Sequence, residues 1–173
     1  MFKSLLKKHL SEIELLVRSL DLENILSLKK KILITKKKKG RVYIFGNGGS
    51  SSTANHFAVD MKKNARVETI SNSNDNLITC LSNDYAFNSW IKNVLKFYTK
   101  KNDLIIFLSV SGEFKNIINA LKYCKLKKLS HSSLTGLKKN NTVNKISKDF
   151  LWVDSISYIV DLIIGKSIYS SDR

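Results

Sequence analysis

One stretch of continuously apolar sequence, Leu104 to Leu108, constrains the fold of this chain most strongly. A strand without polar residues must be covered on both of its faces, which is typical of a central strand in a parallel sheet. The stretch ends in Ser109-Val-Ser-Gly112, and apolar residues at helical spacing follow it. The sequence therefore predicts a buried strand, a serine-rich turn and a helix in direct succession.

The same succession occurs earlier in the chain. Arg41-Val-Tyr-Ile-Phe45 predicts a strand, Gly46-Asn-Gly-Gly-Ser50 predicts a tight turn, and a helix is expected to open near Ser52 or Thr53. Further strands are predicted at residues 67–70, 77–81, 129–134 and 150–153. Strands that alternate with helices predict an α/β fold with a parallel sheet and right-handed crossovers.

Both ends of the chain are predicted to be helical. Residues 1–40 show helical periodicity as two helices or one kinked helix, and the lysine run 36–39 followed by Gly40 is a polar stop. Residues 156–169 are apolar nearly all round, which favours a helix that is buried or faces another subunit. At 173 residues we expect one domain, with residues 41–173 as its α/β core.

The composition excludes several classes of protein. With 43% hydrophobic residues the chain is not globally disordered, and no apolar run approaches the roughly 20 residues of a membrane span. The N-terminus carries acidic residues and no small-residue cleavage site, so we expect a cytoplasmic protein without a membrane partner. Cys80 and Cys124 lack the spacing of a metal or redox motif and are predicted to be buried thiols.

The formal net charge of +16 favours anionic partners, from sugar phosphates to nucleic acid. Of the 30 cationic residues only four are Arg, the side chain that most often reads bases through paired hydrogen bonds. The lysines are scattered over many elements and no recognised nucleic-acid module is present, so specific nucleic-acid binding is not expected.

The two glycine- and serine-rich turns are candidate phosphate sites. The carboxyl ends of parallel strands share one sheet edge, so both turns should lie there. Glycines allow close backbone approach to an anion, and hydroxyl and N–H groups at a helix start bind phosphate. Taken singly, the first could be only a tight structural turn and the second only a helix cap. Together they favour a phosphorylated ligand.

Three segments, FGNGGSSSTANHFAVDM, LSNDYAF and LSVSGEFKN, resemble those of the sugar isomerase (SIS) domain family, specifically the phosphoheptose isomerase type. The resemblance implies a single SIS domain over residues 1–173. Its fold would be a flavodoxin-like three-layer sandwich with a five-stranded parallel sheet and added N-terminal helices. It also implies a homo-oligomer, tetramer or dimer, with sites between subunits. The implied reaction converts sedoheptulose 7-phosphate into a heptose 7-phosphate for surface polysaccharide and lipopolysaccharide precursors.

The resemblance also implies site residues. The family's substrate-binding positions are occupied here by Asn47, Gly48, Ser50, Asp84, Ser109 and Ser111. The first three would hold the sugar, the fourth its hydroxyl groups, and the last two its phosphate.

A His and a Glu four residues apart face the family's site, and His56 and Asp60 stand in their places. Asp60 would be the base and His56 the acid, and both could contact a metal such as zinc. Residues four apart share one helix face, so proton or metal chemistry is geometrically sensible. Aspartate is one methylene shorter than glutamate, however, and we expect lower activity for that reason. The alternative for His56 is a histidine on the helix surface without a functional role.

Two departures from the family bear on activity. Glu113 and Phe114 replace an Asn and a third Ser of the phosphate turn, which predicts weaker phosphate binding. The family's last helix carries a Gln and a His that the stretch from Asp154 to Lys166 lacks, although Lys166 could supply positive charge. The second departure argues against zinc. It also supports the alternative of a non-catalytic sugar-phosphate-binding or regulatory protein, so the sequence leaves open whether the chain is an enzyme.

Overall fold

One parallel sheet organises the fold, in a computed structural model that describes residues 2–71 and 74–152. Its strands are β1 (Val42–Gly46), β2 (Thr69–Ser71), β3 (Leu104–Ser109), β4 (Ser130–Thr135) and β5 (Phe150–Trp152). They pair in the order β2-β1-β3-β4-β5, and every pair is parallel. The predicted α/β class and five-stranded parallel sheet are confirmed.

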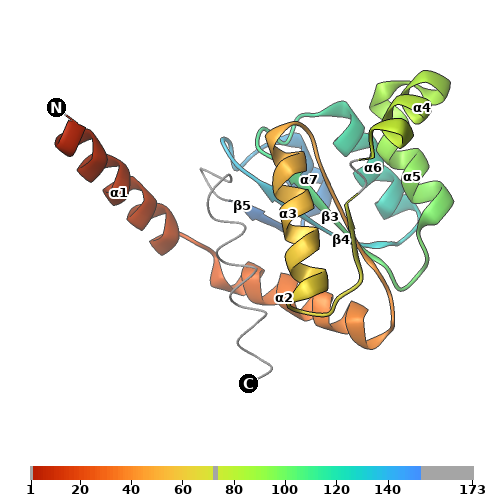
Figure 1. Ribbon diagram of the computed structural model, residues 1–173, viewed down its shortest axis with the longest axis horizontal. Coiled ribbons are helices and arrows are strands. Elements are labelled where there is room, and N and C mark those ends of the chain that lie inside the picture. The colour runs from red at the N-terminus through yellow and green to blue at the C-terminus, as the bar shows by residue number, and fades with distance from the viewer. Residues whose placement is uncertain (1, 72–73, 153–173) are drawn as a thin grey trace.

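Helices cover both faces of this sheet (Figure 1). They are α1 (Phe2–Arg18), α2 (Leu22–Lys37), α3 (Gly49–Lys63), α4 (Asp75–Tyr85), α5 (Trp90–Tyr98), α6 (Lys115–Leu126) and α7 (Thr142–Ser147), with a short 3-10 helix at Phe87–Ser89. Buried residues of α2 and α3 pack on one face, and those of α4, α5, α6 and α7 pack on the other. This arrangement is the expected three-layer sandwich.

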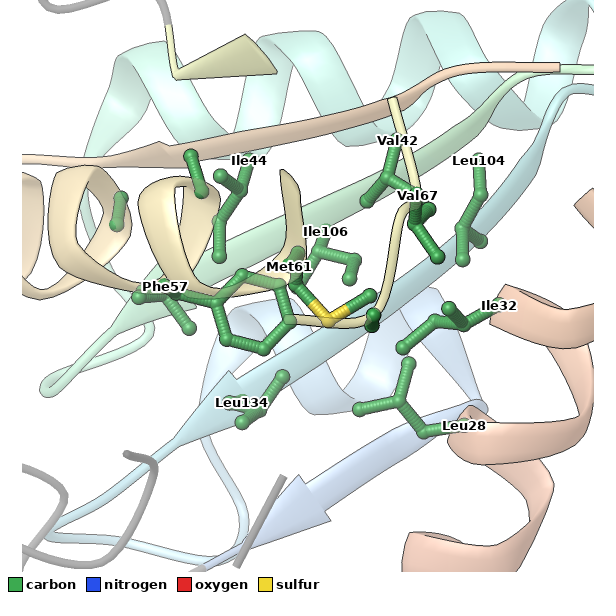
Figure 2. Packing of buried hydrophobic residues seen from close by; sticks show 14 of the residues in the cluster. Leu28, Ile32, Val42, Ile44, Phe57, Met61, Val67, Leu104, Ile106 and Leu134 are labelled. Atoms are coloured by element: carbon green, nitrogen blue, oxygen red, sulfur yellow. The ribbon is translucent and has the colours of Figure 1, made fainter. Parts of the chain in front are cut away.

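Alternation along the strands divides the core in two. Val42 and Ile44 of β1 point to the α2 and α3 side, where Figure 2 shows Ile44 near Phe57 and Met61 of α3 and Val42 near Val67. Tyr43 and Phe45, the other alternate residues of β1, belong to the cluster on the opposite face of the sheet. Because β3 contributes to both clusters, each of its residues is buried. This two-sided burial explains the uninterrupted apolar sequence of the strand.

The predicted strand at residues 77–81 is wrong, because these residues lie inside α4. The side chain of Asn74 caps this helix by accepting hydrogen bonds from the backbone N–H groups of Asn76 and Leu77. The apolar residues of the segment then fall on one helical face, and Cys80 falls outside it. Cys80 is therefore exposed, contrary to the prediction of a buried thiol, whereas Cys124 is buried as predicted.

The N-terminal segment forms two separate helices. Asp21 starts α2 by accepting the backbone N–H of Asn24 at 3.1 Å. Helix α1 extends away from the sheet and its covering helices (Figure 1), and its exposed apolar side chains include Leu6, Leu10, Leu15 and Val17.

The predicted C-terminal helix at residues 156–169 lies outside the described residues, as does the end of the predicted α/β core at residue 173. None of the helices in residues 2–71 and 74–152 is long and apolar enough to cross a membrane.

Candidate functional site

The two candidate turns meet at the point where the strand order reverses. From β1 the chain passes to β2 on one side and later to β3 on the other, so the crevice between β1 and β3 opens at their carboxyl ends. Gly46 pairs with Leu108, which places Asn47 and Ser109 beside each other just past the paired residues. Crevices at such reversals are the usual ligand sites of open α/β sheets.

Two glycines shape the first turn. A Cβ at Gly46 would lie 2.4 Å from the backbone oxygen of Ser50, so only glycine allows α3 to begin this close to β1. Gly48 has φ of +53°, which side-chain-bearing residues rarely adopt, and the space beside its Cα is open. Helix α3 accordingly starts at Gly49, earlier than predicted, and places Ser50 in its first turn.

The second turn carries the two predicted phosphate-binding serines. Ser109 is buried at the end of β3, and its Oγ accepts the Gly112 N–H at 3.1 Å. Ser111 is half-buried, and its Oγ accepts the Glu113 N–H at 3.2 Å. Since each hydroxyl accepts in these bonds, its own proton is not used by them.

The second turn is also held by the start of α7, a contact that the sequence did not indicate. The Glu113 carboxylate accepts hydrogen bonds from the Thr142 backbone N–H at 2.9 Å and from its Oγ1 at 2.6 Å. These bonds lower the pKa of Glu113. Gly112 has φ of +68°, and a Cβ there would lie 2.2 Å from the Asn141 side chain. Weaker phosphate binding through Glu113 stays a prediction, but its carboxylate is already occupied by α7.

Asn116, in the first turn of α6, links the two turns and was missed by the sequence analysis. Its side-chain amide exchanges two hydrogen bonds with that of Asn47. The residue lies within one of the segments that resemble the family, but it carries no charge and its spacing from the serines matches no binding motif. Its partner, Asn47, follows a different strand, so the pairing is seen only in the folded chain.

His56 and Asp60 lie together on α3, as their spacing predicts. His56 Nε2 is 3.5 Å from Asp60 Oδ2, and the side chains are 62% and 30% exposed. Asp60 Oδ1 accepts a hydrogen bond from Asn64 Nδ2 at 3.2 Å. At a helical rise of about 1.5 Å per residue, His56 lies roughly 9 Å beyond Ser50 along the helix axis. The pair is thus more than one helical turn from Ser50, one of the predicted sugar-binding positions.

The described donors do not make a zinc site by themselves. Catalytic zinc sites in proteins use about three protein ligands. Across residues 2–71 and 74–152 no group of three or more His, Cys, Asp or Glu side chains comes together. His56 and Asp60 supply two donors, and Asp154 and Lys166 lie outside the described residues.

Asp84 is exposed near the end of α4, in the layer opposite α3. Its described contacts are with its own helix, to Cys80 Sγ at 3.6 Å and Asn83 Nδ2 at 3.2 Å. The predicted role of Asp84 in holding sugar hydroxyls stays a prediction.

We expect the two cysteines to react very differently with iodoacetamide. The charge of Asp84 is the largest cause that raises the pKa of exposed Cys80, while burial raises the pKa of Cys124 to about 12. Cys80 should be alkylated slowly at neutral pH and faster as pH rises, and Cys124 should react only on unfolding. Asp84→Asn should speed modification of Cys80, as measured by mass spectrometry. Asp75→Asn on the same helix is the control, and an equal acceleration in both variants would contradict the assigned cause.

Comparison with known proteins places this geometry in a family. The SIS domain family model matches residues 8–136. A phosphoheptose isomerase of Helicobacter pylori is 33% identical over 145 residues, which cover 79% of this chain and 76% of the relative. A probable phosphoheptose isomerase of Thermoplasma volcanium is 25% identical over 144 residues, covering 80% and 73% of the two chains.

Solved structures share the fold. The phosphoheptose isomerase of Neisseria gonorrhoeae superposes with a TM-score of 0.85 at 19% identity, covering 98% of both chains. The Vibrio vulnificus NanR protein, solved in complex with ManNAc-6P, gives a TM-score of 0.68 at 14% identity, covering 94% of this chain and 58% of that one. With the family model matching most of its length, the chain belongs to the SIS domain family.

Proposed function

We propose that the protein is an aldose–ketose isomerase that converts sedoheptulose 7-phosphate into a heptose 7-phosphate. The observation that carries the proposal is the meeting of the glycine and serine turns at the crevice between β1 and β3. Hydroxyl protons of Ser109 and Ser111 are available there for a phosphate. Relatives that carry the name phosphoheptose isomerase cover about four fifths of the chain.

The acid–base pair supplies the chemistry in this proposal. The Asp60 carboxylate takes the proton from the carbon beside the carbonyl group, which leaves an enediolate, and returns a proton to the neighbouring carbon. His56 moves a proton between the two sugar oxygens, so that atoms and charge balance over the reaction. The serines that would bind the phosphate and the pair of His56 and Asp60 lie on different elements, which suits a substrate whose phosphate and carbonyl lie at opposite ends of an extended chain.

A non-catalytic sugar-phosphate-binding or regulatory protein is the second candidate. The observation that favours it is the 62% exposure of the His56 side chain, which leaves the acid–base pair open to water. Excluding water strengthens electrostatic interactions in an active site. A chain that kept the two turns and lost the chemistry would still bind the phosphorylated ligand.

Turnover of sedoheptulose 7-phosphate by the purified protein, followed by NMR of the sugar carbons, separates these candidates. Turnover supports the isomerase. No turnover, with ligand-induced shifts in the protein spectrum, supports the binding protein. Neither turnover nor shifts would contradict both.

Zinc and location form part of the proposal. His56 and Asp60 would contribute two zinc ligands, and further ligands would have to come from outside the described residues, so the same NMR assay is run with and without added zinc.

A cytoplasmic location accords with a charged sugar phosphate as substrate, because charged groups enter a bilayer core only at high cost.

Self-association through the N-terminal helices is a further part of the proposal. Leu6 and Leu10 share one exposed face of α1, and neighbouring α2 exposes Leu26. A second copy of the chain would bury these faces. We expect Leu6→Asp combined with Leu10→Asp to yield a smaller species than the wild type in size-exclusion chromatography with light scattering. Leu126→Asp, which changes an exposed residue of α6, is the control. A wild type that elutes as a monomer would overturn the proposal.

Restoring one hydroxyl should strengthen phosphate binding. Phe114 occupies the N-cap of α6 without a capping side-chain hydrogen bond. A serine there could cap the helix, at about 1 kcal/mol, and add a hydroxyl to the phosphate turn. We expect Phe114→Ser to lower the Kd for inorganic phosphate about fivefold, the effect of one added hydrogen bond. Phe114→Ala removes the ring without adding a hydroxyl. Equal gains in both variants, measured by calorimetry, would show that the hydroxyl is irrelevant.

A further inference from the structure

We propose that Asn116 is a positioning residue that orients the Asn47 amide for the sugar and holds the two turns of the site in register. This inference rests on the proposed function. Asn47 Nδ2 donates to Asn116 Oδ1 at 3.0 Å, and Asn116 Nδ2 donates to Asn47 Oδ1 at 2.8 Å. The residues are far apart in sequence, and Asn116 is 2% exposed. A closed amide pair therefore spans the crevice between β1 and β3.

A third hydrogen bond fixes which way the pair is oriented. Turning one amide would set donor against donor and acceptor against acceptor, whereas turning both together would restore the pair. The backbone N–H of Ile117 prevents the joint turn, because it donates to Asn116 Oδ1 at 3.0 Å. A turned Asn116 would present an N–H group to that N–H group. The orientation is thus passed from the start of α6, through Asn116, to Asn47.

The hydrogen bond from the Ile117 N–H also explains why Asn116 is suited to orient Asn47. The first N–H groups of any α-helix lack partners within the helix. Phe114 at the N-cap makes no side-chain hydrogen bond, and the Asn116 side chain accepts the Ile117 N–H instead. Asn116 is therefore anchored to α6, and its remaining bonds extend to the other turn.

The pair leaves Asn47 with unused bonding capacity. A side-chain amide has two N–H donors and two carbonyl lone pairs. The bonds to Asn116 use one of each, so a second N–H and a second lone pair of Asn47 remain for a sugar hydroxyl. Asn47 is half-buried, and the neighbouring space beside Gly48 is open. Asn116 decides where the N–H and where the carbonyl oxygen of Asn47 is presented.

In the part of the chain that the structure describes, no hydrogen bond joins Ser109 or Ser111 to this amide pair, so phosphate and sugar binding should respond differently when the pair is broken. Asn116→Asp keeps the size of the side chain and both accepting bonds, but it cannot donate to Asn47 Oδ1. Asn116→Ala removes all three bonds. Asn119→Asp is the matched control, because its amide lies on the same helix and donates to the Asn88 carbonyl instead.

We expect Asn116→Asp to raise the KM or Kd for sedoheptulose 7-phosphate about tenfold and to leave the Kd for inorganic phosphate within about twofold, the tenfold change matching loss of one hydrogen bond in a buried site. Asn116→Ala should have the larger effect on sugar phosphate. Asn119→Asp should change neither affinity. Equal loss of both affinities, or loss of thermal stability alone, would mean a merely structural role and would overturn the proposal.

A second measurement separates this inference from the proposed function. In ligand-free protein, the Asn47 side-chain NH2 signals should show a cross-relaxation contact to those of Asn116, and Asn116→Asp should shift them while Asn119→Asp does not. Absence of the contact overturns the positioning role whatever the enzyme does. Presence of the contact in a protein that neither binds nor converts sedoheptulose 7-phosphate would overturn the substrate assignment and leave the pair established.

Discussion

Asp60→Asn is expected to reduce kcat for sedoheptulose 7-phosphate by about 100- to 10,000-fold, the range that a positioned general base contributes. The amide keeps the size of the side chain and its place beside His56 but cannot accept a proton from carbon. Affinity for inorganic phosphate should not change, because the described contacts of Asp60 are with His56 and Asn64 and not with the serine turn. NMR of the sugar carbons measures the rate, and calorimetry measures the affinity.

Two further variants make this result specific. Glu68→Gln removes a carboxylate that forms an exposed ion pair with Lys62, and it should leave kcat unchanged. Asp60→Glu adds the methylene that separates this chain from the family's glutamate, and it should raise kcat if reach limits the proton transfer. A fully active Asp60→Asn protein would remove Asp60 from the mechanism.

Asp103→Ala is expected to lower the free energy of unfolding by about 3 kcal/mol, as when a buried ion pair loses one partner. The Asp103 side chain is 2% exposed. It accepts the Arg41 backbone N–H at 2.8 Å, the Arg41 guanidinium at 3.1 Å and the Lys100 N–H at 2.8 Å. Its removal leaves these donors without their acceptor just before β3. For a chain of this size the Tm should fall by roughly 10 °C, measured by calorimetry.

The exposed ion pair of Glu14 and Arg18 provides the comparison. Its side chains are 64% and 74% exposed, so Glu14→Ala should cost about 0.5 kcal/mol or less. Similar losses in both variants would contradict the argument from burial. Because Asp103 precedes β3 and the candidate site follows it, phosphate affinity of the folded Asp103→Ala protein should stay unchanged.

The sequence predicted the sheet well because burial dictated its pattern. β3 is covered on both faces, and its continuous apolar sequence showed this directly. The prediction for residues 77–81 was wrong because a short apolar run fits both a strand and a helix, and the Asn74 cap that starts the helix lies before the run. The outer face of α4 then exposes Cys80, which apolar neighbours had suggested was buried.

The candidate site was only half visible in the sequence. The glycine and serine turns can be recognised from the sequence, because few residue types permit such backbone conformations or offer hydroxyl groups. The bonds from Asn116 to Asn47 and from Glu113 to Thr142 join segments distant in the chain, and no local spacing encodes them. The resemblance to a known family marked Glu113 as a departure from that family's phosphate turn, and the structure shows that its carboxylate contacts Thr142.

The contact between Glu113 and Thr142 limits how this chain can change by mutation. A single substitution that returned the family's Asn to position 113 would remove the carboxylate that accepts both the N–H and the hydroxyl of Thr142. An amide offers only one accepting oxygen to the two Thr142 donors, so the contact between the second turn and α7 would weaken. The Phe114 side chain forms no capping hydrogen bond, so its replacement would break no such contact. A serine at residue 114 would therefore restore one hydroxyl of the family's phosphate turn and leave the contact between Glu113 and Thr142 in place.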